Sequence, residues 1–355
     1  LRESAFCTKI LATNYLVTNK VQDKEKSLKT IFKVEQKLKT SMKKGLEEPF
    51  IYPKKIILKK GSIPATVISI HALTEAKKLF KDTNFEKPLN LDNFIQNCYS
   101  GNGNFAHNDL STYKKKAPAV INTSAMALYY ITFLKAEKNI LNSNINLIIK
   151  KILKSQREDG LWPYCHQNIF DHLIFLNKKN IPSKLKFIYE KINGDSSIFF
   201  GDYLHHIVTI YYLICSIPFL NDKQTRRILK SLKKGFSFIL NHSKNINNEL
   251  KLDFSWEPKL NIIRHCNFYD TSTYFYLLAS CIKGKTLLPS LSNYMPDNLM
   301  IFNYVYNKLS EKNPFKIKSH DPYNDDINLI MPRPAESIFD KAFFFSYLVD
   351  EIFER

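Results

Sequence analysis

The sequence is poor in several features that define common protein classes. It has only 9 Gly in 355 residues, and its 6 Cys form no CxxC pair. Few glycines leave few β-hairpin turns, which argues against an all-β protein. Unpaired cysteines argue against a disulfide framework and indicate a reducing, cytoplasmic location. No run of about 18 uncharged apolar residues occurs, so we expect no membrane-spanning helix.

The charge is strongly one-sided. The chain has 52 Lys and Arg against 33 Asp and Glu, a net charge of +19, and only seven of the basic residues are Arg. We expect no nucleic-acid partner, because there is no Arg-rich run, zinc-finger spacing or RNA-binding signature. The Lys-rich surface is either simply solvated, or it attracts an acidic polymer, a phosphorylated lipid or, peripherally, a membrane surface.

Helical periodicity dominates the chain, and strand signals are scarce. Strongly apolar helices, which must be buried, are expected over residues 4–18, 64–80, 120–136, 202–218, 269–282 and 334–352. Charged, one-faced helices are expected near residues 25–45, 89–98, 143–156, 223–242 and 295–311, with an insert at about 167–200.

This alternation predicts an all-α fold in a single domain over residues 1–355. Because each helical hairpin cannot bury its own apolar face, neighbouring hairpins must close around a common core. We therefore expect an (α/α)6 toroid, a double ring of helical hairpins. An open solenoid of helix pairs is the alternative.

One turn carries a recognisable motif, running from Gln156 through Asp159 and Gly160 to Trp162. It resembles the QW motif of terpenoid cyclases and protein prenyltransferases, in which the Gln ends an outer helix and the Trp stacks on the helix end. Gly160 suits the left-handed turn, since glycine reaches positive φ freely. The motif predicts a fastened helix end and says little about chemistry.

A longer pattern covers roughly residues 120–352. Residues 156–164, the Asp202-x-x-His205 helix start and Met331-Pro332-Arg333 resemble toroid proteins encoded with bacterial capsular and exopolysaccharide synthesis genes. This chain departs from them in having His206 where Thr is usual, in its insert and in lacking a Trp in the last helix. The resemblance implies a carbohydrate-active toroid that acts on, or binds, an acidic polysaccharide or its precursor.

Candidate site residues gather at the expected starts of the buried helices. We expect His205 to act as a general acid or base and Asp202 to orient it, although Asp202 also suits an N-cap. Asp270, with Tyr269, begins another such helix and is either catalytic or a cap. The toroidal polysaccharide lyases use an Asn, a His and a Tyr, and that likeness makes Asn122 a candidate ligand of a uronate carboxylate. The remaining candidates for substrate binding are the anion clamps Arg264 and Arg333, and the sugar-stacking rings Trp162 and Tyr164.

Other readings of the sequence stay open. An isoprenoid enzyme of the terpenoid cyclase or prenyltransferase type is one, although the acidic DxDD cluster of the cyclases is absent. A non-catalytic binding or scaffold subunit is another, because a fold does not decide a function. We expect no metal or cofactor. His265 and Cys266, with Asp202 or His205, could still supply zinc ligands as in the prenyltransferases.

Overall fold

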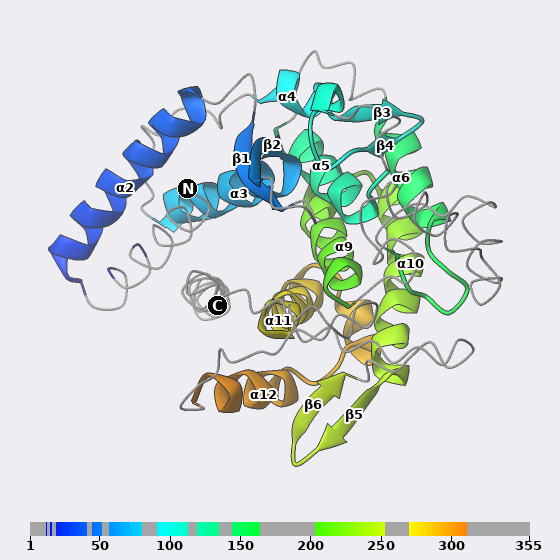
Figure 1. The fold of residues 1–355 in the computed structure, drawn as a ribbon. Coiled ribbons are helices and arrows are strands. Elements are labelled where there is room, and N and C mark those ends of the chain that lie inside the picture. The colour runs from blue at the N-terminus through cyan, green and yellow to red at the C-terminus, as the bar shows by residue number, and fades with distance from the viewer. Residues whose placement is uncertain are drawn as a thin grey trace, which may run out of the picture.

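The computed structural model describes residues 12, 15, 19–40, 45–51, 57–79, 91–112, 119–134, 144–163, 203–252 and 270–310. These residues are mostly helical, as the sequence predicts, and their strands are short (Figure 1). None of the described helices is both long enough and apolar enough to cross a bilayer. The expected first and last buried helices, over residues 4–18 and 334–352, lie almost entirely outside the described residues.

Four helices form the buried layer: α3 (Ile63–Leu79), α5 (Ile121–Leu134), α9 (Tyr203–Ser216) and α11 (Asp270–Leu287). Their apolar residues surround the helix rather than forming one stripe, so each helix must be covered on all sides. In α5, every side chain from residue 121 to 132 is buried. The four helices pack side by side in chain order, α3 on α5, α5 on α9 and α9 on α11.

Neighbouring buried helices run in the same direction. At the start of α3, the Ile63 N–H donates to the carbonyl oxygen of His107 (3.0 Å), and Val120, just before α5, donates from its N–H to Phe105 (3.0 Å). Both helices therefore begin at one short segment. At the other end, Phe133 near the end of α5 packs edge-on against Phe219, just after α9, with ring centroids 5.5 Å apart.

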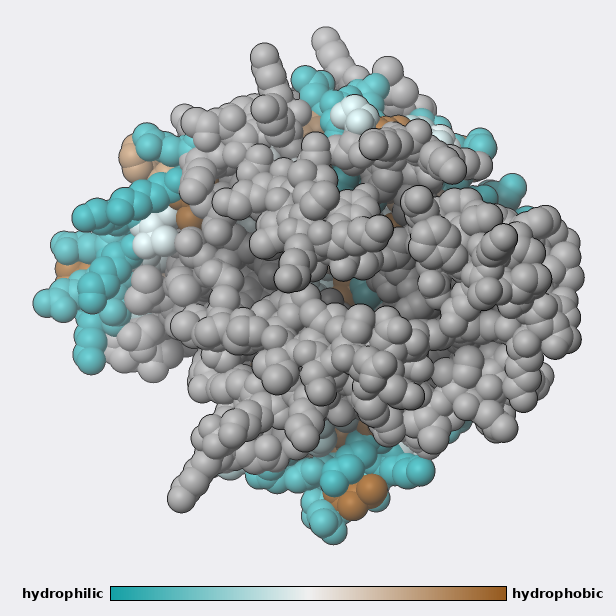
Figure 2. All heavy atoms as spheres, in the orientation of Figure 1, coloured by the Kyte–Doolittle hydropathy of each residue, from teal (hydrophilic) through white to brown (hydrophobic). Residues whose placement is uncertain are grey.

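Helices with a single apolar face cover this layer: α4 (Asp92–Asn97), α6 (Ile145–Lys154), α10 (Asp222–Asn241) and α12 (Asn298–Ser310). Another one-faced helix, α2 (Val21–Thr40), lies at the edge of the molecule (Figure 1). A capping box between Asn221 and Gln224 begins α10. Ile228, Leu232 and Phe236, at spacings of four residues, are fully buried. The solvent-facing sides are polar, and Figure 2 shows hydrophilic residues in teal over α2.

In the part of the chain that the structure describes, three β-hairpins connect one-faced helices to the buried helices that follow. They pair β1 (Leu46–Ile51) with β2 (Ile57–Ser62), β3 (Tyr99–Gly101) with β4 (Asn104–Phe105), and β5 (Ser243–Ile246) with β6 (Glu249–Leu252). The scarcity of glycine predicts few strands. Asparagines supply part of the missing turn geometry: Asn102, Asn247 and Asn248 all have positive φ, between 53° and 59°.

One hydrogen bond recurs where an extended segment meets the next buried helix. The Phe105 N–H donates to Ser124 Oγ (3.1 Å) at the fourth residue of α5. The Trp162 N–H donates to His206 Nδ1 (2.9 Å) at the fourth residue of α9. The Leu252 N–H donates to the Tyr274 hydroxyl (2.9 Å) at the fifth residue of α11. Three different side chains thus fill one structural role at the starts of α5, α9 and α11.

Burial holds several ionisable groups of this core in their neutral form. It raises the pKa of the Cys281 thiol to about 12, and it is also the main cause of the raised pKa values of Cys98, Tyr129 and Tyr130. The cause is desolvation, because a thiolate or phenolate would lose its water shell in the core.

This burial predicts a loss of stability at alkaline pH. Above about pH 9 the unfolded chain releases these protons while the folded chain keeps them, so the free energy of unfolding falls as pH rises. Each group contributes up to about 1.4 kcal/mol per pH unit, and its stabilisation is complete below pH 9. Urea denaturation followed by circular dichroism at increasing pH measures the slope. The variant Cys281→Ala should have a shallower slope, and a stability that stays constant through pH 11 would contradict the prediction.

Candidate functional site

The turn after α6 fastens the end of that helix. Gln156 Nε2 donates to the carbonyl oxygens of Gly160 (2.8 Å) and Ser231 (2.9 Å), and Gly160 adopts the expected positive φ, at 99°. Trp162 is fully buried, and its Nε1–H donates to the Ile152 carbonyl oxygen (3.0 Å) in the last turn of α6. Its ring therefore caps the helix and leaves no exposed surface on which a sugar could stack.

His206 belongs to the same structural joint. It is fully buried, its Nδ1 accepts the Trp162 N–H, and its Nε2 lies 3.1 Å from the Gly235 carbonyl oxygen. Because Nδ1 accepts, the ring proton is on Nε2 and donates to Gly235, so the imidazole is neutral. The two nitrogens join α9 to the turn after α6 and to α10, respectively. Of the two adjacent histidines, His206 is therefore the structural one, while His205 is half-buried.

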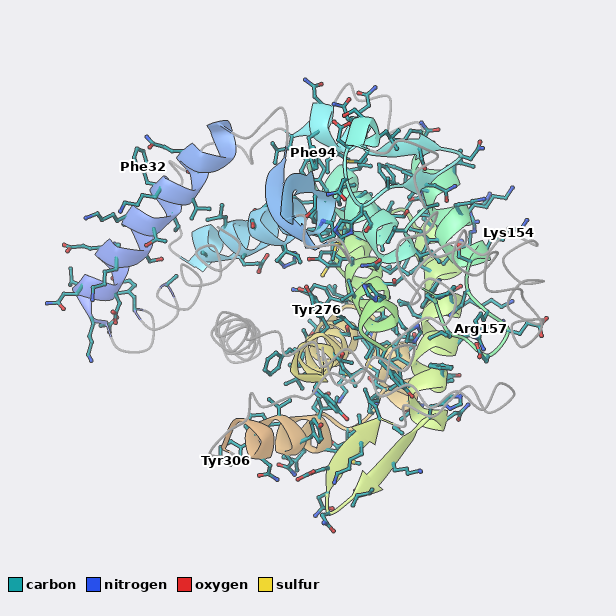
Figure 3. All side chains as sticks on the ribbon, in the orientation of Figure 1. Phe32, Phe94, Lys154, Arg157, Tyr276 and Tyr306 are labelled. Carbon is teal, nitrogen blue, oxygen red and sulfur yellow. The ribbon has the colours of Figure 1, made fainter. Side chains whose placement is uncertain are left out.

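An aromatic cluster forms where the four buried helices meet, and it consists of His71, Tyr129, Tyr211, Tyr212 and Tyr276. His71 of α3 lies against Tyr129 of α5, with ring centroids 5.0 Å apart, and its Nε2 is 3.3 Å from the Tyr211 hydroxyl of α9. Tyr129 also contacts Tyr212 of α9 at 5.7 Å, and Tyr276 of α11 contacts Tyr211 at 5.4 Å. In Figure 3, Tyr276 lies between α11 and α9. The cluster thus combines residues that are far apart in the sequence.

The Tyr129 hydroxyl in this cluster stays neutral and can form hydrogen bonds. Burial raises the pKa of Tyr129 well above its usual value, and the neighbouring Cys215 and Glu75 raise it further. At neutral pH, Tyr129 therefore stays protonated and can donate a proton or a hydrogen bond, but it cannot serve as a phenolate base. His71, Tyr129 and Tyr276 are each 4–5% exposed, whereas Tyr211 is fully buried behind His71.

Asn122 and His205 lie above this cluster, towards the helix starts. Asn122 is seven residues before Tyr129 on α5, and His205 is seven residues before Tyr212 on α9. A spacing of seven residues returns to the same helix face, about 10 Å along the axis. Because Tyr129 and Tyr212 touch and the two helices run in parallel, Asn122 and His205 occupy the same level of adjacent faces. Two of the residues proposed from the sequence therefore lie at one level of neighbouring helices.

The start of α5 also holds unsatisfied polar atoms. Asn122 is 5% exposed and Thr123 is fully buried, and neither Asn122 Oδ1 nor Thr123 Oγ1 has a hydrogen-bond partner among the described residues. A buried acceptor without a partner costs roughly 1–3 kcal/mol. Such a cost is typically accepted where a ligand supplies the missing partner. The helix N-termini around them add positive potential.

Several of the proposed residues cannot be placed. Asp202, Tyr164, Tyr269, Arg264 and Arg333 lie outside the described residues, as do the zinc candidates His265 and Cys266. Asp270 is the first residue of α11, but its side chain is also outside that set. Among the residues that are described, no three His, Cys, Asp or Glu side chains gather closely enough to hold a metal ion.

The aromatic cluster was not proposed from the sequence, although a signal for it exists. His71, Tyr129 and Tyr211 each lie eight residues after the first residue of their helix. Polar aromatic residues at the same depth of successive parallel helices must meet at one level. The common position of these residues can be recognised only when the first residue and the direction of each helix are known.

Comparison with known proteins identifies no relative of this chain. The chain matches no known family model, no curated protein and no solved structure.

Proposed function

We propose that the chain closes as an (α/α)6 toroid. Four described helices already pack side by side, run in parallel and are backed by one-faced helices. The same sequence pattern continues in residues 4–18 and 334–352. Two more buried helices of this kind would complete a ring, with the starts of all the buried helices at one end.

We propose that this end binds an acidic polysaccharide or its phosphorylated-lipid precursor. The observation that supports the proposal best is the placement of Asn122 and His205 on adjacent helix faces above Tyr129 and Tyr212. Amide, imidazole and phenol groups supply the hydrogen bonds that sugar hydroxyls and carboxylates require, and aromatic rings suit the apolar faces of sugars. Positive potential from the helix starts favours the anionic group.

The same residues could carry out lyase or epimerase chemistry. His205 would take the proton from C5 of a uronate, whose carboxylate is held by the Asn122 amide N–H and the helix starts. Tyr129, which stays protonated, would donate its proton to the leaving oxygen on C4. The C5–H and C4–O bonds break and a C4–C5 double bond forms. Afterwards His205 releases its extra proton to water, and Tyr129 takes a proton back from water. In an epimerase the proton would instead return to C5 from the opposite face.

The decisive experiment incubates the protein with polyuronates. Lyase activity appears as ultraviolet absorbance of the unsaturated uronate, and epimerase activity appears as deuterium at C5 after reaction in heavy water. The variants His205→Ala and Tyr129→Phe should each slow the reaction by roughly 10²–10⁴-fold, the usual contribution of a general acid or base. The variant His242→Ala is the matched control, because the His242 ring packs on Phe238 of α10, with centroids 4.6 Å apart, and has no part in the proposed chemistry.

Two outcomes would favour the other functions. The nearly closed aromatic cluster also suits an apolar isoprenoid, because tyrosine rings stabilise carbocations. Binding of an isoprenoid diphosphate, with no binding of any uronate, would replace the carbohydrate proposal. Saturable binding of polyuronates without any product would leave a non-catalytic binding subunit. Each result is read on the same purified protein.

A further inference from the structure

The outer faces of α6 and α10 form a strongly basic surface, which we name the basic wall. Residues 144–163 and 221–242 contain ten Lys and Arg but only three Asp and Glu, a net charge of +7. More than a third of the chain's net charge of +19 therefore lies in these two segments. One of the acids, Asp159, is already paired with Arg157 at 2.7 Å.

Two hydrogen bonds hold these helices side by side and in parallel. Gln224 Nε2 in the first turn of α10 donates to Asn146 Oδ1 in the first turn of α6 (2.9 Å). Gln156, just after α6, donates to the Ser231 carbonyl oxygen further along α10 (2.9 Å). The exposed basic side chains of both helices consequently belong to one continuous surface, and Figure 3 shows Lys154 extending outward from it.

The charges on α10 follow a single stripe. Lys223, Arg227, Lys230 and Lys234 are all exposed and are spaced at four, three and four residues, which keeps them on one helix face. The stripe is about 16 Å long. On α6, the exposed Lys150 and Lys154 are one turn apart and extend the surface sideways.

The shape and chemistry of the basic wall favour a linear polyanion over a bilayer. Ile228 and Leu232 of α10 are buried beneath the stripe, and the exposed Leu240 lies beyond its Lys234 end, so the stripe offers no continuous apolar face for insertion into lipid. The stripe also leads towards the proposed site. The Lys234 end of the stripe packs against Gly160. Two residues after Gly160, Trp162 forms its hydrogen bond with His206, which is the neighbour of His205 in the sequence.

We propose that the basic wall is a second binding site that holds the extended part of an acidic polysaccharide. One sugar unit would occupy the site at Asn122 and His205, and the rest of the polymer would run along α10 with its carboxylates beside the Lys and Arg stripe. The choice of a polysaccharide rests on the proposed function. The interaction is electrostatic, so its affinity falls as salt rises.

The test compares two variants with the same net charge. The first, Arg226→Glu with Arg227→Glu and Lys230→Glu, reverses three exposed charges of the basic wall. The second, Lys26→Glu with Lys29→Glu and Lys33→Glu, reverses three exposed charges of α2, on the opposite side of the molecule in Figure 1. Calorimetry measures the binding of long polygalacturonate and of a galacturonate trisaccharide. Co-sedimentation measures binding to phosphatidylcholine–phosphatidylserine vesicles, and fluorescence anisotropy measures binding to duplex DNA.

The first variant should bind the long polymer about tenfold more weakly, because reversed surface charges each remove a modest attraction. Its binding of the trisaccharide should be unchanged, and the α2 variant should bind both as the natural chain does. Equal weakening in both variants would overturn the proposal, since net charge alone would then explain it. The proposal would also be overturned if the natural chain bound vesicles or DNA more tightly than the polymer. Polymer binding through the wall without trisaccharide binding or turnover would uphold this inference while ending the proposed function.

Discussion

The variant His206→Ala is expected to lose about 3–5 kcal/mol of unfolding free energy. The ring is fully buried and packs between Trp162 and Phe238, with centroids 5.7 Å and 5.3 Å away. Removing it leaves a cavity, leaves the Trp162 N–H without its acceptor, and removes the hydrogen bond that His206 adds to the Gly235 carbonyl oxygen. Both losses occur where α9, α10 and the turn after α6 meet, so no nearby side chain can compensate.

Denaturant titration measures this effect, and the sequence supplies a matched control. His205 is the adjacent residue, is half-buried, and should cost far less when changed to alanine. The variant His206→Asn should be intermediate, because its amide oxygen can accept from the Trp162 N–H but cannot reach Gly235. If His206→Ala were no more destabilising than His205→Ala, the assignment of His206 as the structural histidine would be wrong.

The variant Gly160→Ala is expected to destabilise by more than about 3 kcal/mol. Gly160 has φ of 99°, a conformation that an alanine adopts only with strain. A Cβ at this position would also collide with the carbonyl oxygen of Lys234, a backbone atom of α10 that cannot swing aside. Strain and collision act together at the contact that aligns the turn with α10.

Gly101 separates these two contributions. It also has a positive φ, at 88°, but a Cβ built on it meets nothing within 4 Å. Gly101→Ala should therefore cost only the conformational strain, about 1–2 kcal/mol. The difference between the two glycine variants in denaturant titrations isolates the contact with Lys234. Equal losses in the two variants would refute that contact.

The positions of the buried helices could be predicted closely, because burial on all sides requires apolar residues all round. The predicted range 202–218 compares with α9 at Tyr203–Ser216, and 64–80 with α3 at Ile63–Leu79. The end of α11 was predicted at residue 282, but the helix continues to Leu287. Lys283 and Lys285 are compatible with this extension, because lysines suit the last turns of a helix. Gly284 permits close packing of Met295.

The candidate site could be predicted only in part. Asn122 and His205 stood out because they are polar residues at the starts of apolar helices. Their relation to each other and to Tyr129 depends on α5 and α9 being parallel neighbours, which a linear pattern does not state. His71 could not be distinguished from an ordinary core histidine, because its contacts come from residues 58 and 140 positions further along the chain.

The recurring backbone bond to Ser124, His206 and Tyr274 has a geometric consequence. Serine, histidine and tyrosine are progressively longer side chains. The backbone N–H groups that they bind are therefore held further from the helix axis at α9 than at α5, and further at α11 than at α9. In the toroid that we propose, the end of the ring bounded by these extended segments would be wider at α11 than at α5. An asymmetric opening of this kind would admit a bulky chain from one side and fix the direction in which it enters.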